Sequence, residues 1–178
     1  LFPTGARFDV IGYACTSASS VIGEARVSEL ITGARPEAAS TNPATALKAA
    51  LGVLGAQRVS VLTPYNVAVT QDIVAMLEKD DFKVTSVTTF NEEVEATVAR
   101  ITPQSILAAA VAAGQNEAAE AVFISCTNLR CAGIIAEAER RTGKPVLSSN
   151  LALLWHMLRL AGLETQGIAE SRLLNHCN

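Results

Sequence analysis

Short apolar runs alternate with helical stretches through most of this 178-residue chain, and this alternation is the strongest constraint on its fold. Strands are expected near residues 59, 84, 122 and 146, with a stretch of helical periodicity between successive strands. Strands that alternate with helices form a parallel sheet covered by helices on both faces and joined by right-handed crossovers. The sequence therefore predicts an α/β fold, with a self-sufficient lobe over residues 58–149.

An earlier apolar run, Phe8–Ala14, predicts a first strand that is buried on both faces and followed by a helix over about Val21–Thr32. Such a strand needs neighbours on both sides, and nothing before it can supply one. We therefore expect N-terminal sequence to be missing, so that residues 1–57 form an incomplete first lobe and a linker helix. Residues 150–178 are expected to be a C-terminal helix that returns to the first lobe.

One helix in the first region has clear boundary signals. Thr41 or Asn42 is suited to the N-cap, Pro43 to the first helical position, and Gly55 to the end. The predicted strand Phe8–Ala14 would leave an apolar edge uncovered, and such an edge can pair with a second copy of the chain. We therefore keep a homo-oligomer open.

The charge and hydropathy of the chain exclude several classes of partner. The net charge is only -3 and the basic residues are scattered, so there is no basic surface for nucleic acid. No apolar run reaches the roughly 18 residues that span a bilayer, and the N-terminus has no signal-peptide pattern. We expect a cytoplasmic protein that binds neither nucleic acid nor a membrane.

The four cysteines are too sparse for a secreted disulfide scaffold, and their spacing fits no familiar metal site. No glycine-rich phosphate loop is present either. The sequence predicts no metal and no cofactor. Cys131 and Cys177 have no special context and are expected to be structural or incidental.

The other two cysteines end apolar runs in the same way, in "YACTS" and "ISCTN". Each of them, Cys15 and Cys126, is expected just before a helix, where free N–H groups and the helix dipole lower a thiol pKa from about 8.5. Cysteine is also a common core residue, so a structural role for either one remains an alternative. The repetition of the pattern favours two reactive thiols.

Ligands of open parallel sheets bind beyond the carboxyl ends of the strands. Polar candidates at those ends are Thr16, Ser17, Tyr65, Asn91 and Thr127. The Tyr65 hydroxyl could donate to a substrate oxygen, although a role as a lid over apolar side chains is equally consistent with the sequence.

The motifs "YACTS", "TPY", "ISCTNLR" and "PVLSSN" followed by "WHMLRLAG" together resemble the aspartate/glutamate racemase superfamily. The resemblance is to the branch that holds maleate cis-trans isomerases and arylmalonate decarboxylases, and it covers about Phe8–Gly162. It implies two pseudo-symmetric lobes with parallel sheets flanked by helices, and an active site between the lobes. One cysteine from each lobe would face the substrate.

By this resemblance Cys15 is the first-lobe cysteine and Cys126 the second-lobe cysteine. In the isomerases the first is the nucleophile and the second an acid/base partner, whereas the racemases use both as an acid and base pair. The decarboxylases have glycine in place of Cys15. The groups that the resemblance assigns to substrate binding are Thr16, Ser17, Tyr65, Thr127 and Asn91.

The function predicted from the sequence is a cofactor-independent cis-trans isomerase or racemase of a small, maleate-like dicarboxylate. Two alternatives stay open: an arylmalonate-type decarboxylase, and an accessory protein that binds a carboxylate without catalysis.

Overall fold

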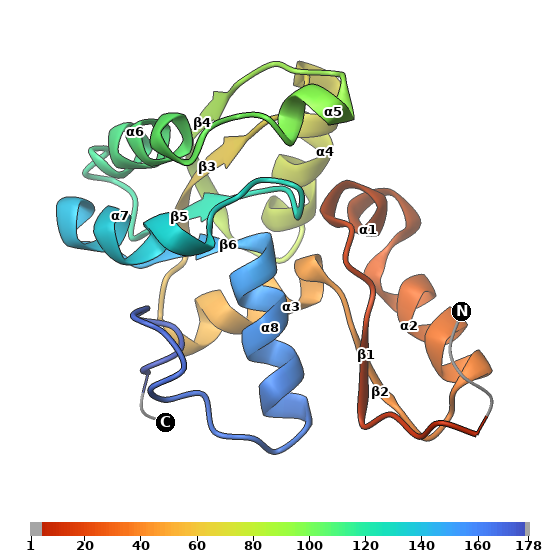
Figure 1. Cartoon of the computed structure of the whole chain (residues 1–178). Coiled ribbons are helices and arrows are strands. Elements are labelled where there is room, and N and C mark those ends of the chain that lie inside the picture. The colour runs from red at the N-terminus through yellow and green to blue at the C-terminus, as the bar shows by residue number, and fades with distance from the viewer. Residues whose placement is uncertain (1–4, 177–178) are drawn as a thin grey trace.

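The computed structural model describes residues 5–176 and contains two parallel sheets (Figure 1). The larger sheet has the strand order β4-β3-β5-β6. All neighbouring strands in it are parallel, as the alternation predicts. Its strands are β3 (Arg58–Thr63), β4 (Lys83–Thr89), β5 (Ala121–Ile124) and β6 (Val146–Ser148).

Helices cover both faces of the larger sheet, and each face has its own apolar cluster. Side chains alternate along β5, so that Phe123 lies in one cluster while Val122 and Ile124 lie in the other. The Phe123 face is covered by α3 (Pro43–Val53), α4 (Val67–Glu78) and α8 (Ser149–Leu160). The opposite face is covered by α6 (Pro103–Gly114), η1 (Ala132–Ile134) and α7 (Ile135–Thr142), with the short α5 (Glu95–Val98) at its edge.

The boundaries of α3 follow the sequence signals. Asn42 is the N-cap, and its side-chain oxygen accepts from the backbone N–H groups of Ala44 and Thr45 at 3.0 and 3.1 Å. Pro43 is the first helical residue, and Gly55 follows the helix with a positive φ of 65°.

The smaller sheet consists of β1 (Val10–Gly12) and β2 (Ala39–Thr41), which pair in parallel with Val10 beside Ala39. Here the sequence prediction was partly wrong. The strand is shorter than Phe8–Ala14, and within it only Ile11 is buried. Its partner β2 was missed because its small residues form no apolar run.

The helix after β1 also differs from the prediction. Two helices, α1 (Thr16–Ile22) and α2 (Glu24–Ala34), replace the one expected over Val21–Thr32. They are separated by Gly23, whose φ of 88° breaks the helical path. The first helix therefore begins directly after Cys15.

Helix α8 connects the two sheets. It packs along α3 and also contacts β1, β2 and β6, which places it in the centre of the molecule (Figure 1). A Cβ on Gly12 would lie 2.7 Å from the sulfur of Met157, so the absence of a side chain at Gly12 lets α8 approach β1 closely. Within residues 5–176, no helix is long and apolar enough to cross a bilayer.

Candidate active site

Cys15 lies between β1 and α1 and is the N-cap residue of that helix, as the sequence predicts. Its thiol is partly exposed, and its sulfur lies 3.8 Å from the Ser17 hydroxyl. The Ser19 hydroxyl donates to the Cys15 carbonyl at 2.6 Å, one turn along α1. Cys15 thus places, at the start of α1, a thiol that solvent or a small molecule can reach. The first helical turn also has free backbone N–H groups.

Cys126 follows β5 in a different local structure from the one expected. The next helical residues begin only at Ala132, so Cys126 does not cap a helix. Its backbone has a φ of 121°, a conformation that is strained for any residue with a side chain and that recurs at functional sites. The side chain is 3% exposed, and its sulfur accepts a hydrogen bond from the backbone N–H of Asn128 at 3.3 Å.

Hydrogen bonds join the two cysteine-bearing loops. The hydroxyl of Ser149, at the start of α8, accepts from the Thr16 hydroxyl at 2.8 Å and from the backbone N–H of Cys126 at 3.1 Å. The Thr127 hydroxyl donates to the Ala14 carbonyl at 3.0 Å. Two of these bonds, Thr16 to Ser149 and Thr127 to Ala14, connect residues more than 100 positions apart in the chain, so the folded protein brings the two Cys-Thr motifs together.

Tyr65 follows β3, and its hydroxyl lies near the two cysteine-bearing loops. It lies close enough to the Cys126 sulfur and the Ser17 hydroxyl to interact with both, and it interacts electrostatically with Cys15. Burial is the main cause that raises the pKa of Tyr65 far above its ordinary value. The phenol therefore stays protonated and can donate to the Cys126 sulfur.

The expectation of a lowered thiol pKa is wrong for Cys126. Burial, which disfavours the thiolate, raises its pKa. The hydrogen bonds from Tyr65 and from the Asn128 N–H favour the thiolate, but they only partly offset this effect. At neutral pH the buried sulfur of Cys126 carries its proton, which suits it to act as an acid.

Asn91, a candidate from the sequence, and Cys131, which is expected to be structural, have different surroundings. Asn91 is exposed, has a left-handed φ of 52°, and its N–H donates to the Thr89 hydroxyl at 2.8 Å. Within the described chain, no hydrogen bond joins it to either cysteine. Cys131 is buried, and burial together with the nearby Cys126 raises its pKa to about 12. Cys177 lies outside the described residues.

Ser149 is the main site residue that was not assigned from the sequence. Its signal was the "PVLSSN" strand end, which places a hydroxyl at the same edge of the sheet as Cys126. Over residues 5–176, no group of three or more His, Cys, Asp and Glu side chains is arranged to hold a metal ion.

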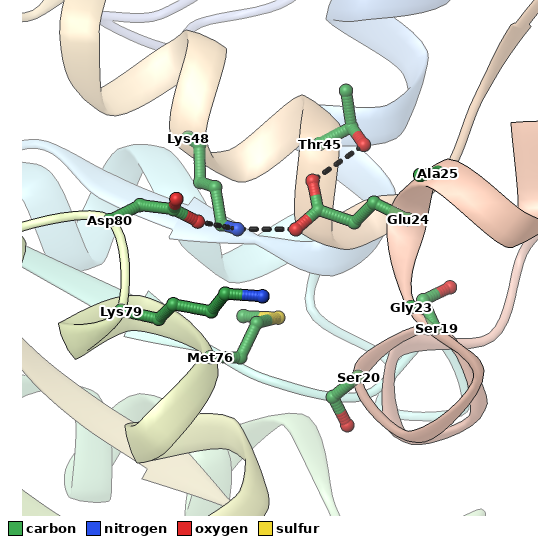
Figure 2. Close-up of a pocket in the computed structure, with 10 residues that line it drawn as sticks. All are labelled: Ser19, Ser20, Gly23, Glu24, Ala25, Thr45, Lys48, Met76, Lys79 and Asp80. Atoms are coloured by element: carbon green, nitrogen blue, oxygen red, sulfur yellow. Dashed lines mark hydrogen bonds and ion pairs between the residues drawn. The ribbon is translucent and has the colours of Figure 1, made fainter.

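A separate polar cleft of about 550 Å³ lies between the α1–α2 junction, α3 and the end of α4 (Figure 2). Neither cysteine lines it. Lys48 projects from α3 between the carboxylates of Glu24 and Asp80 and forms an ion pair with each. Because Glu24 starts α2 and Asp80 follows α4, these ion pairs join the cysteine-bearing first lobe to the larger sheet.

The fold and the site define an α/β protein with two parallel sheets, in which hydrogen bonds hold the cysteine-bearing loop of one sheet against that of the other. The sequence model of the arylmalonate decarboxylase family matches residues 4–174. The chain therefore belongs to the arylmalonate decarboxylase family.

Several known proteins are similar to the chain. A maleate isomerase from Pseudomonas putida is 29% identical over 167 residues, which are 89% of this chain and 66% of that protein. An arylmalonate decarboxylase from Bordetella bronchiseptica is 30% identical over 123 residues, 68% of this chain and 51% of that protein. The chain thus spans about two thirds or less of the length of these relatives.

A solved structure of a maleate cis-trans isomerase from Nocardia farcinica superimposes with a TM-score of 0.87 at 28% identity. The match covers 96% of this chain and 72% of that one. The solved protein is a cysteine-to-serine mutant with a covalently bound succinylcysteine intermediate. The α/β fold with parallel sheets flanked by helices, expected from the sequence, is thereby confirmed.

Proposed function

We propose that this protein is a cofactor-independent cis-trans isomerase of a small dicarboxylate, most concretely of maleate to fumarate, and that Cys15 and Cys126 are its catalytic residues. The observation that carries the proposal is the hydrogen-bond network that joins the two cysteine-bearing loops through Thr16 and Ser149. Similarity to maleate isomerases, one of them with a succinylcysteine intermediate, supports this choice of reaction.

The different surroundings of the two thiols support different roles. The Cys15 thiol is partly exposed at a helix N-terminus, where backbone N–H groups can bind a substrate carboxylate. The Cys126 thiol is buried and its pKa is raised. We therefore assign the nucleophile to Cys15 and the proton donor to Cys126.

In the proposed reaction the Cys15 thiolate attacks one alkene carbon of maleate and forms a C–S bond. The π electron pair moves to the neighbouring carbon, where it is stabilised by the adjacent carboxylate, and Cys126 gives that carbon its proton. Rotation about the new C–C single bond follows. The Cys126 thiolate then removes a proton from the same carbon, the double bond re-forms, the C–S bond breaks, and fumarate leaves.

Polar groups around the thiols can hold the substrate carboxylates. We assign this role to the hydroxyls of Thr16, Ser17, Tyr65 and Thr127. Tyr65 is the best placed of them because its hydroxyl contacts both Cys126 and Ser17. Asn91 is a weaker candidate, since it lies exposed on the loop after β4.

The test is fumarate formation from maleate by the intact gene product, followed by NMR. Cys15→Ala and Cys126→Ala should each reduce turnover by at least about a thousandfold, because each removes a group that forms or breaks a bond. Cys131→Ala is the matched control and should keep most of the activity. If both active-site variants turn over maleate at the original rate, the proposal is wrong.

Related reactions are separated by the same assay. A racemase would leave maleate unchanged and exchange the α-proton of aspartate or glutamate with solvent deuterium. A decarboxylase would release carbon dioxide from an arylmalonate. Cys15 distinguishes this chain from the glycine-containing decarboxylase pattern, which is why isomerisation ranks first. The cytoplasmic location and the possible homo-oligomer stay predictions.

A further inference from the structure

Asn128 makes hydrogen bonds in two directions from the turn that carries Cys126. Its backbone N–H donates to the Cys126 sulfur at 3.3 Å. Its side-chain amide donates to Glu95 on α5, at 3.2 Å to the backbone carbonyl and 2.8 Å to the carboxylate. Asn128 thus fixes a carboxylate to the same turn that holds the second active-site sulfur.

Glu95 differs in charge from the other titratable groups that face Cys126. Tyr65 approaches from the end of β3, and Cys131 lies five residues further along the chain. The pKa values of both are raised, so both are neutral at neutral pH. Cys15 interacts electrostatically with Tyr65. Glu95 is the carboxylate among these groups, and its charge favours the protonated form of Cys126.

We propose that Glu95 is a positioning residue for the acid step, and that its carboxylate, held in place by Asn128, keeps the proton on the Cys126 sulfur until the substrate carbanion takes it. Glu95 acts through its field and through Asn128, and it makes no contact with the reacting atoms. The role of Cys126 as the acid rests on the proposed function. The placement of the Glu95 carboxylate near this thiol is independent of the proposed function.

The experiment measures thiol reactivity, so its outcome is independent of any assay of turnover. Iodoacetamide alkylates thiolates, and the pH midpoint of the alkylation rate reports the thiol pKa. Trypsin separates the cysteines, because Cys126 lies in the peptide Ile101–Arg130 and Cys131 in the next peptide. Mass spectrometry of the digests then follows each cysteine in the native protein.

Glu95→Gln keeps an oxygen for Asn128 and removes the charge. The expected result is a fall of about 0.5 unit in the Cys126 midpoint, or roughly threefold faster alkylation below the midpoint, as a partly screened charge would produce. The difference between the variant and the unmodified protein should shrink in molar salt, because Glu95 is exposed to solvent.

Glu93→Gln is the matched control. It removes the same charge two residues away, where the Glu93 carboxylate is held by Asn66 at 3.1 Å instead of by Asn128. It should leave the Cys126 midpoint nearly unchanged. In an Asn128→Ala background, Glu95→Gln should have a much smaller effect than in the original protein, since the carboxylate is no longer held beside the turn.

An unchanged or raised midpoint in Glu95→Gln overturns the proposal. So does faster alkylation of both Cys126 and Cys131, because this would mean that the turn had opened. A lowered Cys126 midpoint without maleate turnover would support the role of Glu95 and refute the proposed function. Maleate turnover together with an unchanged Cys126 midpoint in Glu95→Gln would support the proposed function and refute the role of Glu95.

Discussion

The two lobes of the protein contribute one cysteine each, but they are built on very different amounts of core. The larger sheet has four strands with an apolar cluster on each face. The smaller sheet has two strands, and Ile11 is the one buried residue of β1. The two thiols differ in the same way. Cys126 is buried next to the larger core, whereas Cys15, next to the smaller sheet, is partly exposed.

This contrast suggests how a pair of related motifs acquires two chemical roles. Burial favours the protonated form of a thiol, and an accessible helix N-terminus favours an attacking anion. The same Cys-Thr pattern can therefore provide an acid in one lobe and a nucleophile in the other. The difference is set by what packs around each motif.

The largest expected effect tests the unequal cores directly. Phe123→Ala removes a fully buried ring from the larger sheet and should lower the free energy of unfolding by about 3–5 kcal/mol. Ile11→Ala in the smaller sheet should cost about 2 kcal/mol, at the low end of the range for such changes. Urea unfolding followed by the fluorescence of Trp155 measures both, and equal losses would contradict the comparison.

A smaller effect is expected where the two lobes are joined by ion pairs. Lys48→Met removes the ammonium group between Glu24 and Asp80 (Figure 2) and leaves a partly buried carboxylate without its cation. We expect a loss of about 1–2 kcal/mol, between the values for exposed and for buried ion pairs.

Arg26→Met is the matched control for Lys48→Met, because it breaks an exposed ion pair with Glu29 within α2. It should cost less than about 0.5 kcal/mol. The same urea titration compares the two variants, and indistinguishable losses would show that the Lys48 ion pairs do not connect the lobes.

The smallest effect concerns pH at the contact between α8 and β2. The ring of His156 lies 2.7 Å from the Thr41 hydroxyl, and burial lowers the pKa of His156. A histidine with a lowered folded-state pKa contributes stability that is fully present above its unfolded-state pKa of about 6.5. This stability is lost as the pH falls from there through the lower folded-state pKa. His156→Gln should therefore weaken the loss of stability on acidification below pH 6.5. Thermal unfolding of both proteins across this range checks it, and identical pH profiles would contradict it.

Sequence patterns predicted the larger lobe well because its strands are apolar and its helices have strong caps. The N-cap at Asn42 and the buried face of β5 both follow from local chemistry. In contrast, β2 was missed because Ala39–Thr41 has no apolar run, and it is specified by pairing with β1.

The residues of the candidate site could be proposed from the sequence, but their electrostatics only in part. The strand-end rule places Tyr65 and Cys126 at the same edge of the larger sheet. Cys15 follows β1 of the smaller sheet and reaches them through hydrogen bonds between the loops. The rule could not give the sign of the pKa shift at Cys126, because that sign depends on burial and on the late start of the following helix. It also could not reveal Ser149 as the shared acceptor, since that contact joins segments distant in sequence.

The central claim is that the two cysteines act on one substrate in different roles, and trapping of a covalent adduct tests it most directly. Cys126→Ser in the intact gene product, incubated with maleate and digested with trypsin, should carry the mass of one added maleate on the peptide Phe8–Arg26 that contains Cys15. Cys15→Ser should carry no adduct on the peptide Ile101–Arg130. An adduct on Cys126 in the second variant, with none on Cys15 in the first, would contradict the assignment of nucleophile and acid.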